Sequence, residues 1–374
     1  MNLKMYYVIN ARLPNKKAYG IQVAKMCEAF IEAGVDLELV IPRTHASQST
    51  SMRDFYQLRV DVPTTILPTV DWYAGGRIGY YVSASIFAIS CFFYLIIERI
   101  KGKRGIFYSI PDTFSLVAGL AAGMDCYLEI HEMLLQAPLL KLLRVAHGLI
   151  ATNPMIAESL RKILGGQTHI IVEPNAVDLD PFEHVPSKEE SRQQVHLPSS
   201  EQIVLYIGRF YAWKGLGILV AAAARAPSFA WYVVGGTREE FMQVTGSQTV
   251  PANLHVVGEC TLDEVPLWQA TADVLLILGT KENEQSYRNT TPMKVYEYMA
   301  SNRPIVASHT PALTSVMQES EVTFYEPDDA QNLVDMVTKV FENVSDSQAR
   351  VTHAYQSAMK HTWTRRVARI LSFI

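Results

Sequence analysis

The sequence has few cysteines, and none of them form a close pair. Its four cysteines, Cys27, Cys91, Cys126 and Cys260, are scattered along 374 residues. The absence of a C-x-x-C pair excludes a zinc knuckle and a dithiol redox motif. We therefore expect single, buried thiols in a reducing compartment.

The chain also lacks a strong net charge and a secretory leader. It has 33 basic and 37 acidic residues, a formal net charge of -4, which argues against a dedicated nucleic-acid binder. Residues 1–5 run directly into an apolar strand pattern, without the apolar region and cleavage site of a signal peptide. Hydrophobic residues make up 49% of the sequence, which is typical of a globular protein. We expect a cytoplasmic protein.

The charge is distributed unevenly between the two halves. Up to Val177 the sequence has 17 basic and 14 acidic residues, whereas the remainder has 16 basic and 23 acidic residues. The first half is therefore the one expected to face an anionic surface or acceptor.

A single long segment has no charge. The 20 residues Ile78–Ile97 are enough to span a bilayer as a helix. The favoured interpretation is a buried helix between two strands, because spanning would place those strands on opposite sides of a membrane. A third possibility is a helix lying at the membrane interface, since the basic residues Arg99, Lys101, Lys103 and Arg104 follow.

Short apolar runs alternate with longer amphipathic stretches, which predicts parallel, doubly wound sheets of the α/β class. The clearest helix of the first half is Ala18–Ala33. The strands expected there are Met5–Asn10, Asp36–Ile41, Thr65–Leu67, Ile106–Ile110, Cys126–Ile130, Gly148–Thr152 and His169–Val172.

The same pattern restarts after the polar, proline-containing segment 181–200. The strands expected in this half are Ile203–Ile207, Ala230–Val234, Leu254–Val257, Val274–Leu278 and Pro304–Ala307. The expected helices are Gly215–Ala224, Leu262–Ala272, Pro292–Ala300 and Ala330–Glu342, the last capped by Asp328–Asp329.

We therefore predict two Rossmann-like domains, 1–180 and 181–357, with a linker near Asp178–Pro186. Ligands of open parallel sheets bind beyond the carboxyl ends of the strands. Two such sheets that face each other would hold a donor on one side and an acceptor on the other.

The first chemical motif follows the strand Ile203–Ile207. Gly208 permits a tight turn out of the sheet. Arg209 offers a planar cationic fork for phosphate oxygens, and Lys214 adds a second positive charge. These residues would hold a diphosphate, or they are two solvated basic side chains on a loop.

The second motif is the segment 289–300, with the sequence NTTPMKVYEYMA. Thr290 or Thr291 is expected to cap a helix with Pro292 in its first turn, leaving free N–H groups for an anion. Glu297 lies about one and a half turns further along and can accept hydrogen bonds from vicinal hydroxyls such as those of ribose. The alternative is an exposed glutamate that offsets Lys294.

Taken together and in this order, the motifs resemble glycosyltransferase family 4, whose members have the GT-B fold. The similarity extends over nearly the whole chain. It is carried by Gly208-Arg209 with Lys214-Gly215, T-P-x-K-x-x-E-Y-M-A, Pro304–Ser308, Pro174–Asp178 and Trp363–Arg365. The resemblance implies two facing Rossmann-like domains and a C-terminal helix, about 358–374, that crosses back onto the first.

The resemblance also implies roles for individual residues. Arg209 and Lys214 would neutralise the departing diphosphate, and Glu297 would bind the ribose. His131, in the run Y-L-E-I-H-E, matches a strand-end histidine beside the donor sugar, although the residue type alone favours a structural histidine. Gly20 would let the backbone approach donor or acceptor, or it is a simple helix-start glycine.

Two positions depart from the family pattern. Asn289 stands eight positions before Glu297, where many members have a glutamate that contacts the transferred sugar. Ser315 stands where many relatives have an acidic residue. Asn289 keeps a hydrogen-bonding amide without charge, so the donor preference of glutamate-bearing members does not carry over.

No carboxylate pair indicates a metal site, so we expect no cofactor and no metal. The resemblance implies retaining transfer of a hexose-type sugar from a nucleotide diphosphate, and we expect the acceptor to be a hydroxyl of a lipid-linked or cell-surface glycan. The protein would then be cytoplasmic, with peripheral contact on the inner face of the membrane. A nucleotide-sugar epimerase and a non-catalytic nucleotide-sugar-binding protein remain as alternatives.

Overall fold

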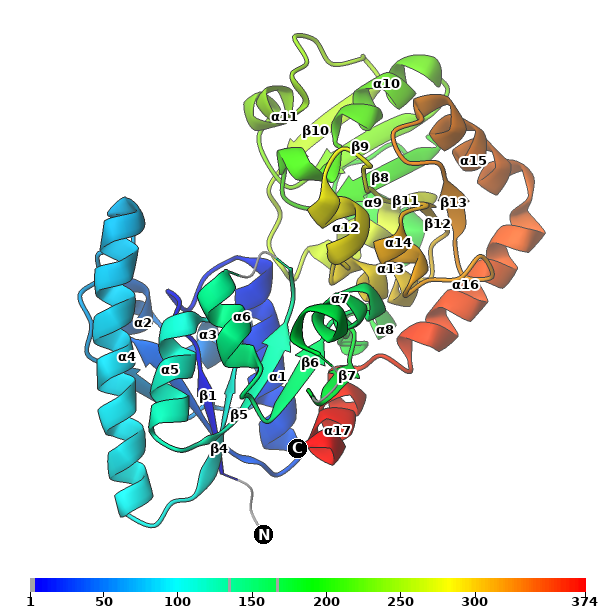
Figure 1. The fold of residues 1–374 in the computed structure, drawn as a ribbon. Coiled ribbons are helices and arrows are strands. Elements are labelled where there is room, and N and C mark those ends of the chain that lie inside the picture. The colour runs from blue at the N-terminus through cyan, green and yellow to red at the C-terminus, as the bar shows by residue number, and fades with distance from the viewer. Residues whose placement is uncertain (1–3, 134–135, 166–167) are drawn as a thin grey trace. The chain divides into compact units, whose positions relative to one another are not determined.

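The computed structural model describes residues 4–133, 136–165 and 168–374. The chain divides into two compact units, unit 1 with Met1–Pro174 and Trp363–Ile374, and unit 2 with Asn175–Thr362 (Figure 1). The chain therefore leaves unit 1 a few residues before the expected boundary at 180, and returns a few residues after the expected boundary at 357.

Unit 1 is built on a seven-stranded sheet in the order β3-β2-β1-β4-β5-β6-β7, and every pairing in it is parallel. This order has the reversal at β1 that defines a doubly wound sheet, as predicted. Its strands are β1 (Lys4–Val8), β2 (Asp36–Pro42), β3 (Thr64–Leu67), β4 (Gly105–Ser109), β5 (Asp125–Ile130), β6 (Gly148–Ala151) and β7 (Ile170–Val172).

The C-terminal helix α17 belongs to unit 1 and lies beside α1 (Figure 1). The chain thus returns to the first domain at its end, as the sequence predicted. The helices of unit 1 are α1 (Ala18–Glu32), α2 (His45–Ser49), α3 (Met52–Tyr56), α4 (Gly76–Ile100), α5 (Thr113–Ala121), α6 (Ala137–Leu143), α7 (Pro154–Leu164) and α17 (Trp363–Phe373).

Unit 2 contains a six-stranded parallel sheet in the order β10-β9-β8-β11-β12-β13, with the same reversal. Its central strand β8 is buried along its whole length, and its alternate side chains enter two hydrophobic cores on opposite faces of the sheet. The strands are β8 (Ile203–Ile207), β9 (Ala230–Val234), β10 (Leu254–Gly258), β11 (Val274–Ile277), β12 (Ile305–Ser308) and β13 (Thr323–Tyr325).

The helical elements of unit 2 include a 3-10 turn η1 and a π-turn η2, both of which lie near the carboxyl edge of the sheet. In order, the elements are α8 (Asp180–Glu183), α9 (Lys188–Gln194), η1 (Ala212–Lys214), α10 (Gly217–Arg225), α11 (Arg238–Thr245), α12 (Val265–Thr271), η2 (Gln285–Asn289), α13 (Lys294–Ala300), α14 (Pro311–Thr314), α15 (Ala330–Glu342) and α16 (Val344–Ala358).

The segment Asp178–Pro186, where we expected the linker, lies just inside unit 2 and contains the short helix α8, and the polar residues after it form α9. The polar sequence is helical there because Ser187 and Glu190 form a capping box, each bonding to the other's backbone N–H.

Helix α4 is not the fully buried helix that we favoured. One face packs on the sheet through Phe87, Cys91 and Leu95, whereas Ile78, Ile89, Phe93, Ile97 and Ile100 are exposed. Only 28% of its most apolar window, with a mean hydropathy of 1.9, is buried. By length and composition it is the one helix among the described residues that could cross a membrane.

The cysteines are largely buried, as expected. Cys27, Cys91 and Cys126 are buried and Cys260 is partly buried, and all four are free. Burial raises the pKa of the Cys260 thiol to about 11, with neighbouring carboxylates adding to the effect.

Candidate functional site

Gly208 is the first residue beyond β8, at the carboxyl edge of the sheet in unit 2. Its φ of 147° is one that side chains rarely allow. A Cβ atom at this position would lie 2.5 Å from Nζ of Lys294. The glycine therefore serves both the turn out of the strand and the space for a lysine that comes from α13.

Lys294 does not have the surface position that the alternative interpretation of the second motif gave it. Instead of offsetting Glu297 at an exposed surface, its Nζ lies 4.0 Å from the centre of the Tyr206 ring and donates a hydrogen bond to the carbonyl of Ile207. Burial lowers the pKa of Lys294 well below its ordinary value, and the nearby Lys214 lowers it further.

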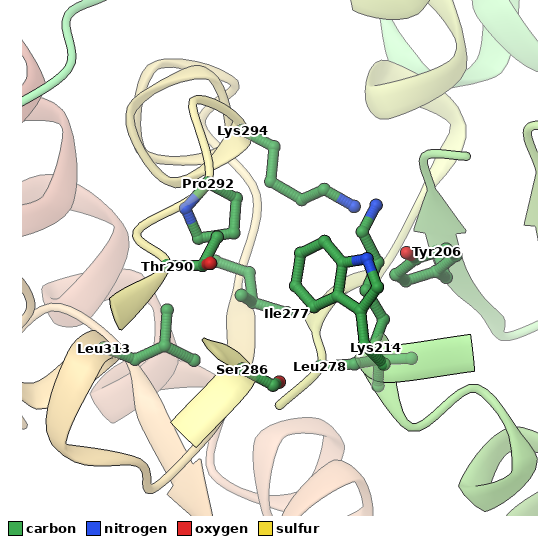
Figure 2. A pocket seen from close by; sticks show the side chains of 10 residues that line it. Tyr206, Lys214, Ile277, Leu278, Ser286, Thr290, Pro292, Lys294 and Leu313 are labelled. Atoms are coloured by element: carbon green, nitrogen blue, oxygen red, sulfur yellow. The ribbon is translucent and has the colours of Figure 1, made fainter. Parts of the chain in front are cut away.

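Lys214 ends the turn η1 and points into the same space (Figure 2). Its Nζ donates a hydrogen bond of 3.1 Å to the carbonyl oxygen of Arg209 and lies 5.0 Å from the centre of the Tyr211 ring. Burial, together with the charge of Arg209, lowers the pKa of Lys214 to about 8. Gly215, with a φ of 72°, lets the chain leave this turn.

The two lysines converge on a small, partly open pocket. Figure 2 shows the side chains of Lys214 and Lys294 pointing toward the same space, close to Tyr206. The pocket is lined by Tyr206, Trp213, Lys214, Ile277, Leu278, Ser286, Thr290, Pro292, Lys294 and Leu313.

These contacts define a cationic site in which the positive charges of the lysines are not paired with carboxylates in the described residues. Among the residues that the structure describes, neither Lys214 nor Lys294 forms an ion pair with a carboxylate. Both ammonium groups are bonded only to backbone carbonyls and lie near aromatic rings. Desolvated ammonium groups of this kind favour an anion as ligand.

Glu297 lies in the first turn of α13 and is partly exposed. Burial raises the pKa of its carboxyl group, and Lys294 opposes this shift. Asn289 ends the π-turn η2, and Thr290 lines the pocket, so the second motif does lie beside the first.

The predicted cap of this helix is wrong. The helix α13 begins at Lys294 rather than Pro292, and its N-cap is Met293, with no side-chain cap. The N–H of Thr290 instead donates to the carbonyl of Gln285, which closes the π-turn, and the carbonyl of Thr291 accepts a hydrogen bond from Asn175. The threonines therefore belong to the turn before the helix.

His131 and Gly20, the other predicted site residues, lie in unit 1. His131 follows β5, and its Nε2 is 3.0 Å from Oε1 of the buried Glu129. A Cβ atom on Gly20 would lie 2.4 Å from the Tyr56 hydroxyl, which bonds to the backbone of Asn15. Gly20 therefore has a packing role, and its contact with a donor or acceptor stays a prediction.

The comparisons with known proteins agree with this geometry. Residues 201–343 match the family model described as Glycosyl transferases group 1. The match includes Gly208, Arg209, Lys214 and the segment 289–300, and so covers every predicted donor-site residue of unit 2.

The chain also matches a named glycosyltransferase over part of its length. The chain is 22% identical over 198 residues to TuaC of Bacillus subtilis (strain 168), a glycosyltransferase named for teichuronic acid biosynthesis. The match covers 52% of this chain and 46% of TuaC, so it spans about half the length of that relative.

Solved structures show that the fold is that of the GT-B glycosyltransferases. Sucrose-phosphate synthase from Thermosynechococcus elongatus superposes with a TM-score of 0.79 at 17% identity, over 99% of this chain and 98% of the other. Anabaena Alr3699/HepE, solved in complex with UDP-glucose, superposes with a TM-score of 0.74 at 14% identity, over 100% of both chains. The predicted fold class is confirmed.

Proposed function

We propose that this protein is a retaining glycosyltransferase that takes a hexose-type sugar from a nucleotide diphosphate without a metal. The observation that carries the proposal is the pair of partly buried lysines, Lys214 and Lys294, beside Gly208, in a region that matches the glycosyltransferase group 1 model. A diphosphate supplies the negative charge that these ammonium groups lack.

Arg209, Lys214 and Lys294 would act on the leaving group. As the bond between the anomeric carbon and the phosphate oxygen breaks, negative charge grows on the diphosphate and positive charge on the sugar ring. Preorganised cations in a desolvated site stabilise that separation most. The acceptor hydroxyl then bonds to the anomeric carbon from the face that the diphosphate leaves, and its proton passes to the departing phosphate.

The remaining residues would orient the donor. Glu297 accepts hydrogen bonds from the ribose hydroxyls, and Asn289 and the Thr290–Thr291 backbone contact the sugar or the phosphates. His131 approaches the donor sugar from unit 1, and Gly20 lies where the chain of that unit turns into α1. HepE, whose structure was solved in complex with UDP-glucose, supports a uridine nucleotide as the first choice to test.

A thermal-shift panel of UDP, GDP, ADP and dTDP tests the donor site. Ligand at a hundred times its dissociation constant adds about 2.7 kcal/mol of stability, which corresponds to a rise of several degrees. We expect one nucleotide to stabilise the wild type and to stabilise Glu297→Ala much less. If none of the four shifts the wild type, the donor site is wrongly assigned.

Turnover separates the proposal from its two alternatives. A transferase consumes the nucleotide sugar only when a hydroxyl acceptor is present, apart from slow hydrolysis. An epimerase consumes it without acceptor, and a sensor binds it without turnover. Nucleotide release, measured with and without a glycan acceptor, therefore decides among the three.

We further propose a lipid-linked acceptor, bound where the outer face of α4 contacts the inner face of the membrane. The exposed fractions of Ile78, Phe93 and Ile100 are 71%, 58% and 80%. Transfer of such a stripe into the acyl boundary of a bilayer is favourable. Trp72 and Tyr81, both exposed near the start of α4, are residue types that favour the headgroup level.

Helix α4 is proposed to lie in the plane of the interface rather than to span the bilayer. It connects β3 to β4, and both strands belong to the sheet of unit 1. Phe87, Cys91 and Leu95 keep its other face in the core of that unit. A spanning orientation would break this packing.

The basic residues after α4 are less free than the sequence indicated. Lys101 and Lys103 both pair with the buried Glu98, at 2.9 and 2.7 Å. Arg99 donates to the carbonyls of Ala122 and Gly123, at 2.7 and 2.9 Å. The segment still has a positive excess, so anionic headgroups add to the apolar contribution.

Co-sedimentation with liposomes tests the surface. We expect the wild type to bind vesicles that contain anionic lipid, and Phe93→Asp and Ile97→Asp to lose most of that binding. Leu262→Asp is the matched control, because Leu262 and Ile97 are both 49% exposed but Leu262 lies in unit 2. Equal binding by all four proteins, or no binding by the wild type, contradicts a membrane role for α4.

A further inference from the structure

Glu129 and Arg366 form an ion pair in which neither side chain is exposed to solvent. Arg366, from α17, reaches Oε1 of Glu129 at 2.6 Å and Oε2 at 3.2 Å. Replacing a buried pair of this kind by apolar residues is often neutral or stabilising, so stability alone explains it poorly.

The carboxylate of Glu129 is nearly saturated with donors. Tyr108 donates to Oε2 at 2.6 Å, and Gln22 donates to Oε1 at 2.5 Å. Together with the two bonds from Arg366, these fill the roughly four acceptor positions that a carboxylate offers. His131, whose Nε2 lies 3.0 Å from Oε1, is a further neighbour of this carboxylate. It experiences the negative charge of Glu129, although other donors already occupy the acceptor positions of the carboxylate.

Arg366 also fastens the last helix to the end of unit 1. Its Nε donates to the carbonyl of Pro174 at 2.7 Å, and its Nη2 donates to the carbonyl of Glu173 at 3.2 Å. Pro174 is the last residue of the first segment of unit 1. One side chain thus connects α17, the exit of the chain and the carboxylate beside His131.

We propose that Arg366 is a positioning residue, which sets the orientation and the proton affinity of His131 through Glu129. Arg366 compensates the negative charge of Glu129 and occupies two of its acceptor positions. The imidazole is then held 3.0 Å from a carboxylate whose charge is compensated. His131, whose side chain is 25% exposed, remains able to present its other nitrogen at the surface.

The groups that face Glu129 make this testable by titration. They are Arg366 on α17, Tyr108 on β4, Tyr7 on β1 and His131 itself, with Cys27 on α1 beside Tyr7. Arg366 holds the pKa of Glu129 well below its usual range, and burial raises the pKa of both tyrosines and of Cys27 far above neutrality.

The experiment follows the titration of His131 by NMR, in protein labelled with ¹³C-histidine and assigned with His131→Asn. We expect Arg366→Met to move the titration midpoint to higher pH, because the uncompensated carboxylate then attracts a proton to the imidazole. Glu129→Gln should move it to lower pH. Arg366→Lys, which restores the charge, should return it most of the way.

Arg366→Met and Glu129→Gln both remove the same ion pair, so a nonspecific loss of structure would shift the His131 midpoint in the same direction in both. Opposite shifts therefore indicate an electrostatic effect. Arg369→Met is the matched control on α17, because Arg369 pairs with Glu173 instead, at 2.8 Å. Circular dichroism spectra and unfolding midpoints of the variants, compared with those of the wild type, report whether unit 1 is folded in each. Midpoints that stay at the wild-type value in both Arg366→Met and Glu129→Gln overturn the proposal.

Activity connects this inference to the proposed function, on which its catalytic part depends. If His131 contacts the donor sugar, Arg366→Met should lower kcat by about tenfold or more with a smaller change in the donor KM, and Arg366→Lys should recover most of it. Shifted midpoints with unchanged kcat would leave the coupling intact and remove His131 from the reaction, which overturns the proposed role of that residue alone.

Discussion

The affinity for the nucleotide diphosphate should fall as the pH rises from 7.5 to 9.0. The pKa of Lys214 is lowered to about 8 by burial and by Arg209, so a growing fraction of the empty site has a neutral amine in this range. The diphosphate binds the ammonium form, whereas its own last ionisation, near pH 6, is complete. Binding above pH 8 therefore requires the uptake of a proton.

The size of the effect follows from the titration curve. With a pKa of about 8, the protonated fraction of Lys214 falls about eightfold between pH 7.5 and 9.0, which is about 1.3 kcal/mol of binding free energy. The pKa of Lys294 is lowered in the same direction, so its titration makes the dependence steeper. Salt bridges with the phosphates restore both charges in the complex.

Isothermal titration calorimetry of the nucleotide at several pH values measures this dependence. We expect a Kd that rises about eightfold or more, and an apparent enthalpy at pH 8 that varies with the ionisation enthalpy of the buffer. Lys214→Arg, which stays charged, should weaken the dependence without abolishing binding. A Kd that is constant from pH 7.5 to 9.0, with no buffer effect, would refute the argument.

Three further predictions concern the same elements. Arg209→Ala and Lys214→Ala should each lower kcat by an amount equivalent to about 2.7–4 kcal/mol of transition-state stabilisation, and near-wild-type turnover in both would remove them from the reaction. Gly208→Ala should lower stability in urea by about 1–3 kcal/mol and weaken nucleotide binding, whereas Gly246→Ala, with a positive φ of 67° and no neighbour within 4 Å of its Cβ, should affect stability only. Phe87→Ala should cost about 3–5 kcal/mol of unfolding free energy and Phe93→Ala less than about 0.5, because the first side chain is buried and the second lies on the exposed face of α4.

Much of the fold could be predicted because the strands of both sheets are short, continuous apolar runs. The bounds of β8 and β9 are those expected, and the helix α15 spans Ala330–Glu342 as predicted. In α15 the Asp329 side chain accepts a hydrogen bond from the N–H of Asn332, so a visible cap coincides with a strong apolar period.

Elements with a weak apolar period were missed. The helix α16, Val344–Ala358, buries Ser347, Val351, Ala354 and Ala358 at helical spacing, but these side chains are small or polar. The edge strand β13 has only three residues. In both cases, packing against neighbouring elements decides a structure that the local pattern specifies poorly.

At the start of α13 the motif was identified correctly, but the conformation predicted for it was wrong. Thr290, Thr291 and Pro292 have the order of a capped helix start. The preceding residues form a π-turn that takes up the N–H of Thr290, so the helix begins later. A π-turn has no simple sequence signature, and single turns of this kind are frequent at functional sites.

The electrostatics of the site could not be predicted, because they depend on a contact between residues that are distant in sequence. Lys294 reaches the end of β8 only because Gly208 lacks a side chain there, and parallel strands bring α13 to the same edge of the sheet. Its spacing to Glu297 indicated a surface ion pair, a pattern that takes no account of burial. Two desolvated lysines with no carboxylate partner among the described residues destabilise the empty site. That cost is relieved when an amine loses its proton or when an anion enters, so the geometry of the ligand-free protein favours an anionic ligand.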